Sequence, residues 1–360
     1  MKRLALLALF AIATLPGFAA DAAKPNALTP KEIADGWLLL FDGATTFGWE
    51  IDGEARVEQG QLLLGGAKAT TARFTTQFPI YQLHIEFLAW QGKERSTIQL
   101  GEARTLYTLS NLKDLGHFTG GLGRRDKATT PVIITVPAGS QVAVQNVKLQ
   151  PSALTPLFNG KDLAGWKEHA GKKSKFAVVD GVINVKDGPG DLQTDGQWAD
   201  FLLQLDCISN GKQLNSGIFF RCRPGEYQNG YEAQVHNGWH PEATKEYAVD
   251  TYDPETGKVV KTDKVKSAAM DFGTGAIYRR VPARKELSKD GEWFTMTVVA
   301  QGRHLATWVN GVQTVDWTDT RPVKDNARNG AKLDKGNISI QGHDPTTDLS
   351  FRNFRIVELK

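Results

Sequence analysis

Hydrophobic and polar residues alternate along most of the chain with a period of two, which is typical of half-buried β-strands. In residues 201–207, Leu203 and Leu205 share one face, and Gln204 and Asp206 share the other. The same alternation is found in four later segments, 293–299, 305–309, 337–341 and 351–359. A helical period is convincing only in the first 22 residues, with a weaker one over 30–35.

Turn-forming residues are abundant, with 36 glycines and 15 prolines in 360 residues. Such a supply suits many short strands better than long helices. Asn310 and Gly311 lie between two apolar runs and indicate a tight hairpin, because both residues tolerate a positive φ. We therefore predict an all-β protein built from β-sandwiches.

The chain carries one pattern twice, and the openings of the two copies are 117 residues apart. The openings match at Phe41, Gly43 and Trp49 in the first copy and at Phe158, Gly160 and Trp166 in the second. Three further pairs follow in the same order, 57–62 with 178–183, 81–87 with 201–207, and 144–149 with 351–356. The pattern predicts two homologous domains, 30–150 and 153–360, joined near residues 150–152.

The second copy is longer, and its extra length lies mainly in residues 238–269 and 281–317. Long loops on a rigid sandwich often hold functional residues. We therefore expect the second domain to carry the chemistry.

Residues 1–22 are typical of a secretory signal peptide. Lys2 and Arg3 precede an apolar run over 4–15, and small residues follow up to Ala22. The run is too short for a permanent membrane span, and no later stretch reaches 18 apolar residues. We expect a periplasmic or secreted protein without membrane insertion; the alternative is a buried N-terminal helix.

The net charge is +3, and removal of residues 1–20, which carry Lys2 and Arg3 but no acid, leaves +1. A nearly neutral protein without a polybasic arm is not built to bind nucleic acid. The sequence leaves the oligomeric state open.

Two cysteines, Cys207 and Cys222, are too few for a disulfide framework or a four-cysteine zinc site. If their strands formed a hairpin around residues 208–217, the two thiols would be cross-strand neighbours. A disulfide between them and a pair of small buried thiols both stay open.

A polar sheet face is expected in the second domain, because strands 201–207, 217–223 and 231–236 each have one apolar and one polar side. The side chains expected on this face are Asp206, Arg221, Arg223, Glu232, Gln234 and His236. Acids, guanidinium groups, an amide and an imidazole close to aromatic residues suit sugar binding. The alternative is an ordinary solvated face with cross-strand ion pairs.

The second domain also carries a fixed series of motifs, at residues 157–166, 179–181, 215–221, 230–235, 274–278, 291–293, 308–311 and 351–356. Through them the segment 153–360 resembles the 3-keto-disaccharide hydrolase domain family. The resemblance implies a concanavalin-A-like jelly-roll sandwich that acts on a glycoside whose ring carries a 3-ketone. The first domain keeps the opening motif and has Glu86 in the place of Asp206, but it lacks the central motifs, so we expect it not to be catalytic.

A 3-ketone acidifies the hydrogen at C2, and loss of this proton gives an enolate that can expel the C1 substituent. Water can then add to the enone. The reaction needs a base near C2, a donor to the enolate oxygen and an acid for the leaving oxygen. A divalent metal that polarises the ketone would also serve, and the sequence leaves this cofactor open.

The resemblance and the strand pattern suggest residues for these roles: Glu232 or His236 as the base, Arg221 and Gln234 at the ketone or enolate oxygen, and Tyr278 or His343 as the acid. Further candidates for substrate binding are Asp206, Asn215, Arg223 and Gln341. Two other classes stay open. The same sandwich serves as a non-catalytic, lectin-like glycan-binding module, and an ordinary hydrolase would act on glycosides that are not oxidised.

Overall fold

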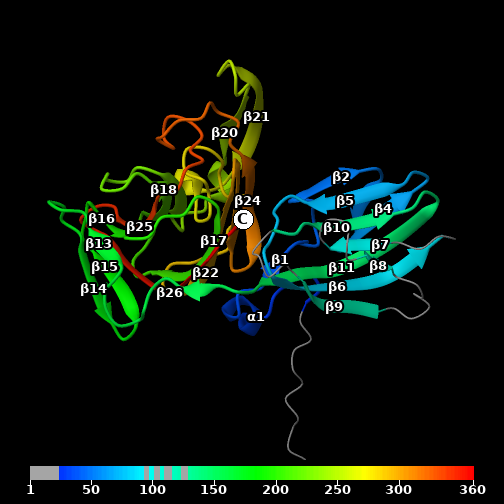
Figure 1. Cartoon of the computed structure of the whole chain (residues 1–360), viewed down its shortest axis with the longest axis horizontal. Helices are drawn as coiled ribbons and strands as arrows, with labels where there is room; N and C mark the ends of the chain where they lie inside the picture. Colours follow the sequence, from blue (N-terminus) through cyan, green and yellow to red (C-terminus); the bar gives the residue numbers. More distant parts are fainter. Residues whose placement is uncertain (1–23, 93–96, 101–105, 109–115, 123–128) are drawn as a thin grey trace, which may run out of the picture.

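The computed structural model describes residues 24–360 except 93–96, 101–105, 109–115 and 123–128. Its secondary structure is almost entirely β, and the two halves of the chain form two sandwiches side by side (Figure 1). The predicted all-β sandwich class is confirmed. None of the helices in the described part is long and apolar enough to cross a membrane. The predicted signal peptide, residues 1–22, lies outside the described residues.

The first half begins with the short helix α1 (Pro30–Ala34). A capping box formed by Thr29 and Glu32 stabilises the N-terminus of this helix. One layer of its sandwich has the order β3-β4-β11-β6-β9, with bounds Ala55–Glu58, Gln61–Gly66, Ser140–Pro151, Tyr81–Gln91 and Gly116–Leu122. The other layer has the order β2-β5-β10-β7-β8, with bounds Trp49–Asp52, Thr70–Phe74, Val132–Val136, Thr97–Leu100 and Leu106–Thr108.

The second half is built in the same way but is larger. Its first layer runs β14-β15-β26-β17-β22-β23-β24, with bounds Lys175–Val179, Val182–Lys186, Asp348–Glu358, Phe201–Ser209, Phe294–Gln301, His304–Val309 and Val312–Thr318. Its second layer runs β13-β16-β25-β18-β19, with bounds Trp166–Glu168, Gly190–Thr194, Asn337–Gly342, Ser216–Cys222 and Tyr231–Val235. The remaining elements are β12 (Thr155–Pro156), the projecting hairpin β20 (Lys245–Tyr252) and β21 (Val259–Ser267), and the single turns η1 (Pro241–Ala243) and η2 (Met270–Phe272).

A short strand, β1 (Leu38–Leu39), joins the two sandwiches edge to edge. Leu38 pairs with Leu149 of the first half, and Leu39 pairs with Val312 of the second. The halves also share a core, because Trp308 packs among first-half side chains with its ring centroid 6.2 Å from that of Phe78. The linker near 150–152 therefore connects two bodies that pack against each other.

The strands of the first half follow the same order as their counterparts in the second half, which has β23 and β24 in addition. The bulges also correspond: Asn146 on β11 and Asn353 on β26 both have a left-handed φ, 48° and 56°. The Asn146 side chain donates to Glu86 at 2.7 Å, and the Asn353 side chain donates to Asp206 at 2.7 Å. The match of Glu86 with Asp206 thus reflects a shared bulge contact. The common origin of the two halves stays a prediction.

The expected hairpin between residues 201–207 and 217–223 is wrong. β17 pairs with β22 and β26, whereas β18 pairs with β19 and β25 in the other layer. Residues 210–215 therefore cross between the layers. Cys207 and Cys222 are both buried and free, so the disulfide alternative is also wrong. Alternation identifies the face of a strand that is apolar, but not the strand beside it.

Candidate functional site

The layer β13-β16-β25-β18-β19 turns a polar face away from the core. Ile218, Ala233 and Ile340 on three neighbouring strands belong to the core, so the residues that alternate with them point outwards. Strand pairing aligns Gln193, Ser339, Phe219 and Glu232 in one row across four strands. In the next row it pairs Asp191 with Gln341 and Gly217 with Gln234.

Loops cover this polar face and bury it. Residues 223–230 fold back on it, because the backbone of Gln228 donates to Asp191 and the Gln193 amide donates to the carbonyl of Glu226. Residues 274–278 pair with the outer edge of β19, where the Tyr278 amide donates to the Glu232 carbonyl at 2.9 Å. The motif at 274–278 thus acts as an additional edge strand that places Tyr278 beside Glu232.

Glu232 is the acid of this face that has properties of a catalytic group. Its side chain opens on a cavity of about 250 Å³, lined by Gly230, Tyr231, Glu232, Tyr278, Arg279, Arg280, Ala327 and Arg328. Burial raises the pKa of Glu232 to about 7, and the guanidinium groups of Arg328 and Arg279 limit the rise. Near neutral pH this carboxyl therefore exchanges readily between its acid and its base form, as a general base must.

Gly217 makes room for the Glu232 carboxyl. A Cβ atom at Gly217 would lie 2.7 Å from Oε1 of Glu232, which is closer than real contacts allow. A glycine is therefore required at this position of the Asn215–Gly217 motif if the Glu232 carboxyl is to keep its place, because any side chain would collide with it.

We expect Gly217→Ala to lower kcat by at least about tenfold, because displacement of a general base by even a short distance is costly. The melting temperature should change little, since the obstructing atoms belong to a side chain that can move. Steady-state kinetics with the proposed substrate and a thermal melt check both. In a Glu232→Gln background the same alanine should have no further effect on kcat; an equal loss there would contradict the explanation.

The far end of the face holds buried polar atoms without partners. Nδ1 of His236, Oε1 of Gln234 and Oε1 of Gln341 find no hydrogen bond in the described part of the chain. Such atoms are costly to bury, so their clustering indicates a place for water or a polar ligand. Beside them, Asp271 and Phe272 have left-handed φ values of 42° and 71°, a strain often found at functional sites.

His236 and Asn215 complete this end. Burial lowers the pKa of His236, with a smaller contribution from His343 in the same direction and opposition from Asp271. Its Nε2 lies 3.7 Å from Oδ2 of Asp271. The Gln234 amide donates to Asn215 Oδ1 at 3.3 Å and to the Asp271 carbonyl at 3.0 Å. His343 is more exposed and bonds to Asp344 at 2.8 Å.

Three residues expected on this face lie elsewhere. Asp206 is on the other layer, where it binds Thr295 and the bulge at Asn353. Arg223 follows β18 and pairs with Glu226 at 2.9 Å. Arg221 is fully buried and donates to the carbonyls of Ala199, Gly302 and Lys332 and to Asp200.

The physical reason for the error at Arg221 is a β-bulge. The pairing of β18 with β25 shifts between Phe219 and Cys222, and Arg221 has a left-handed φ of 50°. One extra residue reverses the alternation. The Arg221 guanidinium therefore does not reach the polar face. It crosslinks three backbone segments through the carbonyls of Ala199, Gly302 and Lys332.

Several residues of the site were missed in the sequence. Asp191, Gln193 and Ser339 alternate with core residues on β16 and β25, and a period-two reading of those segments could have found them. Arg279, Arg280 and Arg328 lie in irregular segments, where no periodic signal exists.

Residues 153–357 match the family described as 3-keto-alpha-glucoside-1,2-lyase-like domain. The chain belongs to this family. We refer to residues 153–357 as the lyase-like domain, and the resemblance stated from its motifs is confirmed. The family places the chain among carbohydrate-active proteins.

Solved structures similar to this chain include a "putative glycosyl hydrolase" from Parabacteroides distasonis, with 25% identity over 57% of this chain and 94% of that chain and a TM-score of 0.42. A second protein of that name and organism has 23% identity over 58% of this chain and 100% of that chain, with a TM-score of 0.41. A carbohydrate binding module from Bacillus subtilis has 12% identity over 53% of this chain and 93% of that chain, with a TM-score of 0.34. The search among curated proteins found no match.

The lyase-like domain does not present an obvious metal centre. In the described ranges of the chain, no three His, Cys, Asp or Glu side chains are placed to bind one cation. The lining of the Glu232 cavity offers one carboxyl beside three guanidinium groups, a donor set that does not fit a divalent cation.

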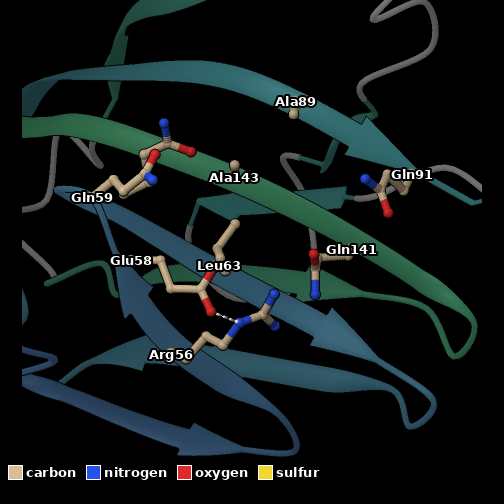
Figure 2. A pocket seen from close by; sticks show the side chains of 9 residues that line it. Arg56, Glu58, Gln59, Leu63, Ala89, Gln91, Gln141 and Ala143 are labelled. Carbon is tan, nitrogen blue, oxygen red and sulfur yellow. Dashed lines mark hydrogen bonds and ion pairs between the residues drawn. The ribbon is translucent and has the colours of Figure 1, made fainter.

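The first half has a cavity of its own, of about 280 Å³, on the outward side of β3, β4, β11 and β6 (Figure 2). Its titratable side chains are Arg56 and Glu58, which form an ion pair of 2.6 Å with each other. The rest of the lining consists of Gln59, Gln61, Leu63, Ala89, Gln91, Gln141 and Ala143. No buried acid comparable to Glu232 lines this cavity.

Proposed function

We propose that the lyase-like domain cleaves the glycosidic bond of 3-keto-glycosides, with Glu232 removing the proton at C2. The observation that carries the proposal is the buried Glu232 carboxyl, with a pKa raised to about 7, on the wall of a cavity that also holds Tyr278 and arginines. A module that only binds sugar has no need of an acid held near its midpoint of ionisation.

The reaction begins when the Glu232 carboxylate takes the proton from C2 and the electron pair of the C–H bond moves towards C3. The C3 carbonyl becomes an enolate, and Arg279 or Arg328, both in the lining of the cavity, stabilises its oxygen. When the carbonyl re-forms, the C1–O bond breaks and the leaving oxygen takes a proton from an acid. Tyr278 is the candidate acid, because it lies next to Glu232 on the same wall. Addition of water to the enone completes a net hydrolysis.

The test is incubation of the purified protein with a 3-keto-disaccharide and with its unoxidised parent, with sugar release followed by NMR. The proposal expects release from the 3-keto-disaccharide alone. Release from both would indicate an ordinary hydrolase. Binding of both without release would indicate a lectin-like module.

The raised pKa of Glu232 also predicts how stability depends on pH. An unfolded chain ionises this residue near its usual 4.5, whereas the folded protein holds the proton up to about 7. Between these values the wild-type protein loses stability as the pH rises, by about 3 kcal/mol in total for this group. Glu232→Gln has no such group, so its melting temperature should rise relative to wild type from pH 5 to pH 8. If the melting temperatures of wild type and Glu232→Gln changed equally from pH 5 to pH 8, the burial of an ionisable acid at this position would be contradicted.

We also propose that the protein is exported, on the strength of the charged, apolar and small-residue pattern of residues 1–22. Protein recovered from the periplasm should begin between residues 20 and 23. Recovery with Lys2 and Arg3 intact would contradict the proposal.

A further inference from the structure

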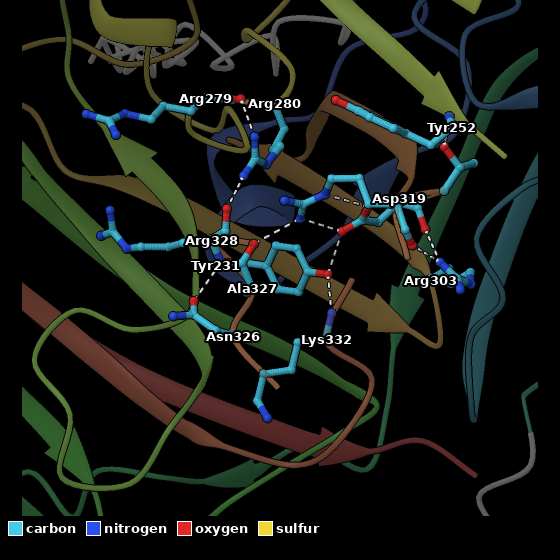
Figure 3. Close-up of polar contacts among 12 residues, drawn as sticks. Tyr231, Tyr252, Arg279, Arg280, Arg303, Asp319, Asn326, Ala327, Arg328 and Lys332 are labelled. Carbon is cyan, nitrogen blue, oxygen red and sulfur yellow. Dashed lines mark hydrogen bonds and ion pairs between the residues drawn. The ribbon is translucent and has the colours of Figure 1, made fainter. Parts of the chain in front are cut away.

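Arginines converge on the Glu232 cavity. Arg279, Arg280 and Arg328 line it directly. Figure 3 shows these three together with Arg303 and Asp319, and Arg321 is hydrogen-bonded to Asp319. Three guanidinium groups around one small cavity raise the question of which anions neutralise them.

The carboxylate of Asp319 already accepts hydrogen bonds from Arg321 and Tyr231. Nε of Arg321 donates to its Oδ1 at 2.9 Å, and Nη2 donates to its Oδ2 at 2.7 Å. The Tyr231 hydroxyl also donates to Oδ2, at 2.7 Å. This carboxylate therefore neutralises Arg321 and has little capacity left for the arginines of the cavity.

Within the described residues, none of the three arginines of the cavity forms an ion pair of 4 Å or less with a carboxylate; Glu232 and Asp319 act on them only through longer-range electrostatics. Arg280 is half-buried and donates to the carbonyls of Arg279, at 3.2 Å, and Arg328, at 2.8 Å. Nε of Arg328 donates to the carbonyl of Gln228, and its guanidinium group lies 5.7 Å from the ring centroid of Phe219. The Arg279 guanidinium lies 5.3 Å from the ring centroid of Tyr278.

Glu232 supplies the lone carboxyl in the lining, and burial keeps it largely protonated up to about pH 7. The cavity therefore holds an excess of positive charge before any substrate binds. Guanidinium groups that line one cavity repel one another, and a bound anion would relieve the repulsion. An enolate alone is a poor match, because it carries a single charge that exists only during the reaction.

We propose that the natural substrate carries an anionic substituent on a sugar ring, such as a carboxylate, sulfate ester or phosphate ester, which Arg279, Arg280 and Arg328 bind. Planar guanidinium groups match the paired oxygens of these substituents and form strong charge-assisted hydrogen bonds with them. The inference rests on the proposed function, since it names the substrate class of the same cavity.

The test measures binding by calorimetry with methyl glucuronide, methyl glucoside 6-sulfate and methyl glucoside. Wild-type protein should bind one or both anionic sugars at least about tenfold more tightly than the neutral sugar. Arg280→Gln should lower that affinity by about 10- to 100-fold and leave neutral binding unchanged. If Arg280→Gln folds poorly, Arg328→Gln, at an exposed position, should likewise lower the affinity for the anionic sugar. Lys324→Gln removes the same charge outside the cavity and should retain the preference.

Equal affinity for the neutral and both anionic sugars, or a preference that both arginine variants retain, would overturn the inference. A parallel assay with a neutral 3-keto-glycoside separates this outcome from failure of the proposed function. Cleavage of that compound without any anionic preference overturns the inference alone. An anionic preference that depends on Arg280 or Arg328, without cleavage of neutral or anionic 3-keto-glycosides, supports the inference and overturns the proposed function.

Discussion

Replacing Glu232 by glutamine is expected to lower kcat on a 3-keto-glycoside by about 10²- to 10⁴-fold, with little change in KM. Glutamine keeps the shape and the polar character of the side chain but cannot accept the C2 proton. Because the lost contact acts in the transition state, turnover should suffer far more than ground-state binding. Steady-state kinetics at pH 7 to 8 measure both parameters.

The matched control is Glu292→Gln, which removes a carboxylate from an exposed position of the same domain. It should leave kcat and KM close to wild type. A Glu232→Gln variant with near wild-type turnover would exclude Glu232 as the base, and His236 would then be the next candidate.

Loss of Arg221 should have the largest effect on stability. Arg221→Ala leaves three backbone carbonyls without their buried donor and breaks the contact with Asp200. We expect the free energy of unfolding to fall by about 3–5 kcal/mol. Chemical denaturation measures the change, and Arg223→Ala is the control because its ion pairs are exposed and should contribute about 1 kcal/mol or less.

A different pattern would contradict this structural role. If Arg221→Ala unfolded like wild type but lost affinity for substrate, Arg221 would contact the sugar, as its place in the sequence motif suggested. The two roles therefore give opposite results in two simple measurements.

The fold class and part of the site could be predicted from the sequence because both depend on local patterns. Alternation gives the strands, and their apolar faces give the core. Glu232 and Gln234 are two residues apart on one strand, so they must share a face wherever that strand lies. Tyr278 was found through its motif, and the backbone pairing of that motif with β19 accounts for its place.

The remaining errors concern which strands lie side by side and where irregular segments run, neither of which an alternating pattern specifies. Asp206 was assigned to the wrong layer because residues 210–215 cross the sandwich, and nothing in a period of two distinguishes a crossing from a hairpin. Arg221 was assigned to the polar face, but a β-bulge of one residue reverses the alternation there and turns its side chain away from that face. Arg279, Arg280 and Arg328 reach the cavity from irregular segments, whose course depends on long-range packing.

The most direct test of the proposed chemistry follows hydrogen at C2. A 3-keto-glycoside should be cleaved in D₂O by wild-type protein and by Glu232→Gln, with NMR of the released sugar and a sample without protein as background. If Glu232 removes the C2 proton, product from the wild type carries deuterium at C2 well above background, and the variant yields little product over the same time. Cleavage that leaves the original hydrogen at C2, or equal deuterium incorporation by the variant, would contradict the account.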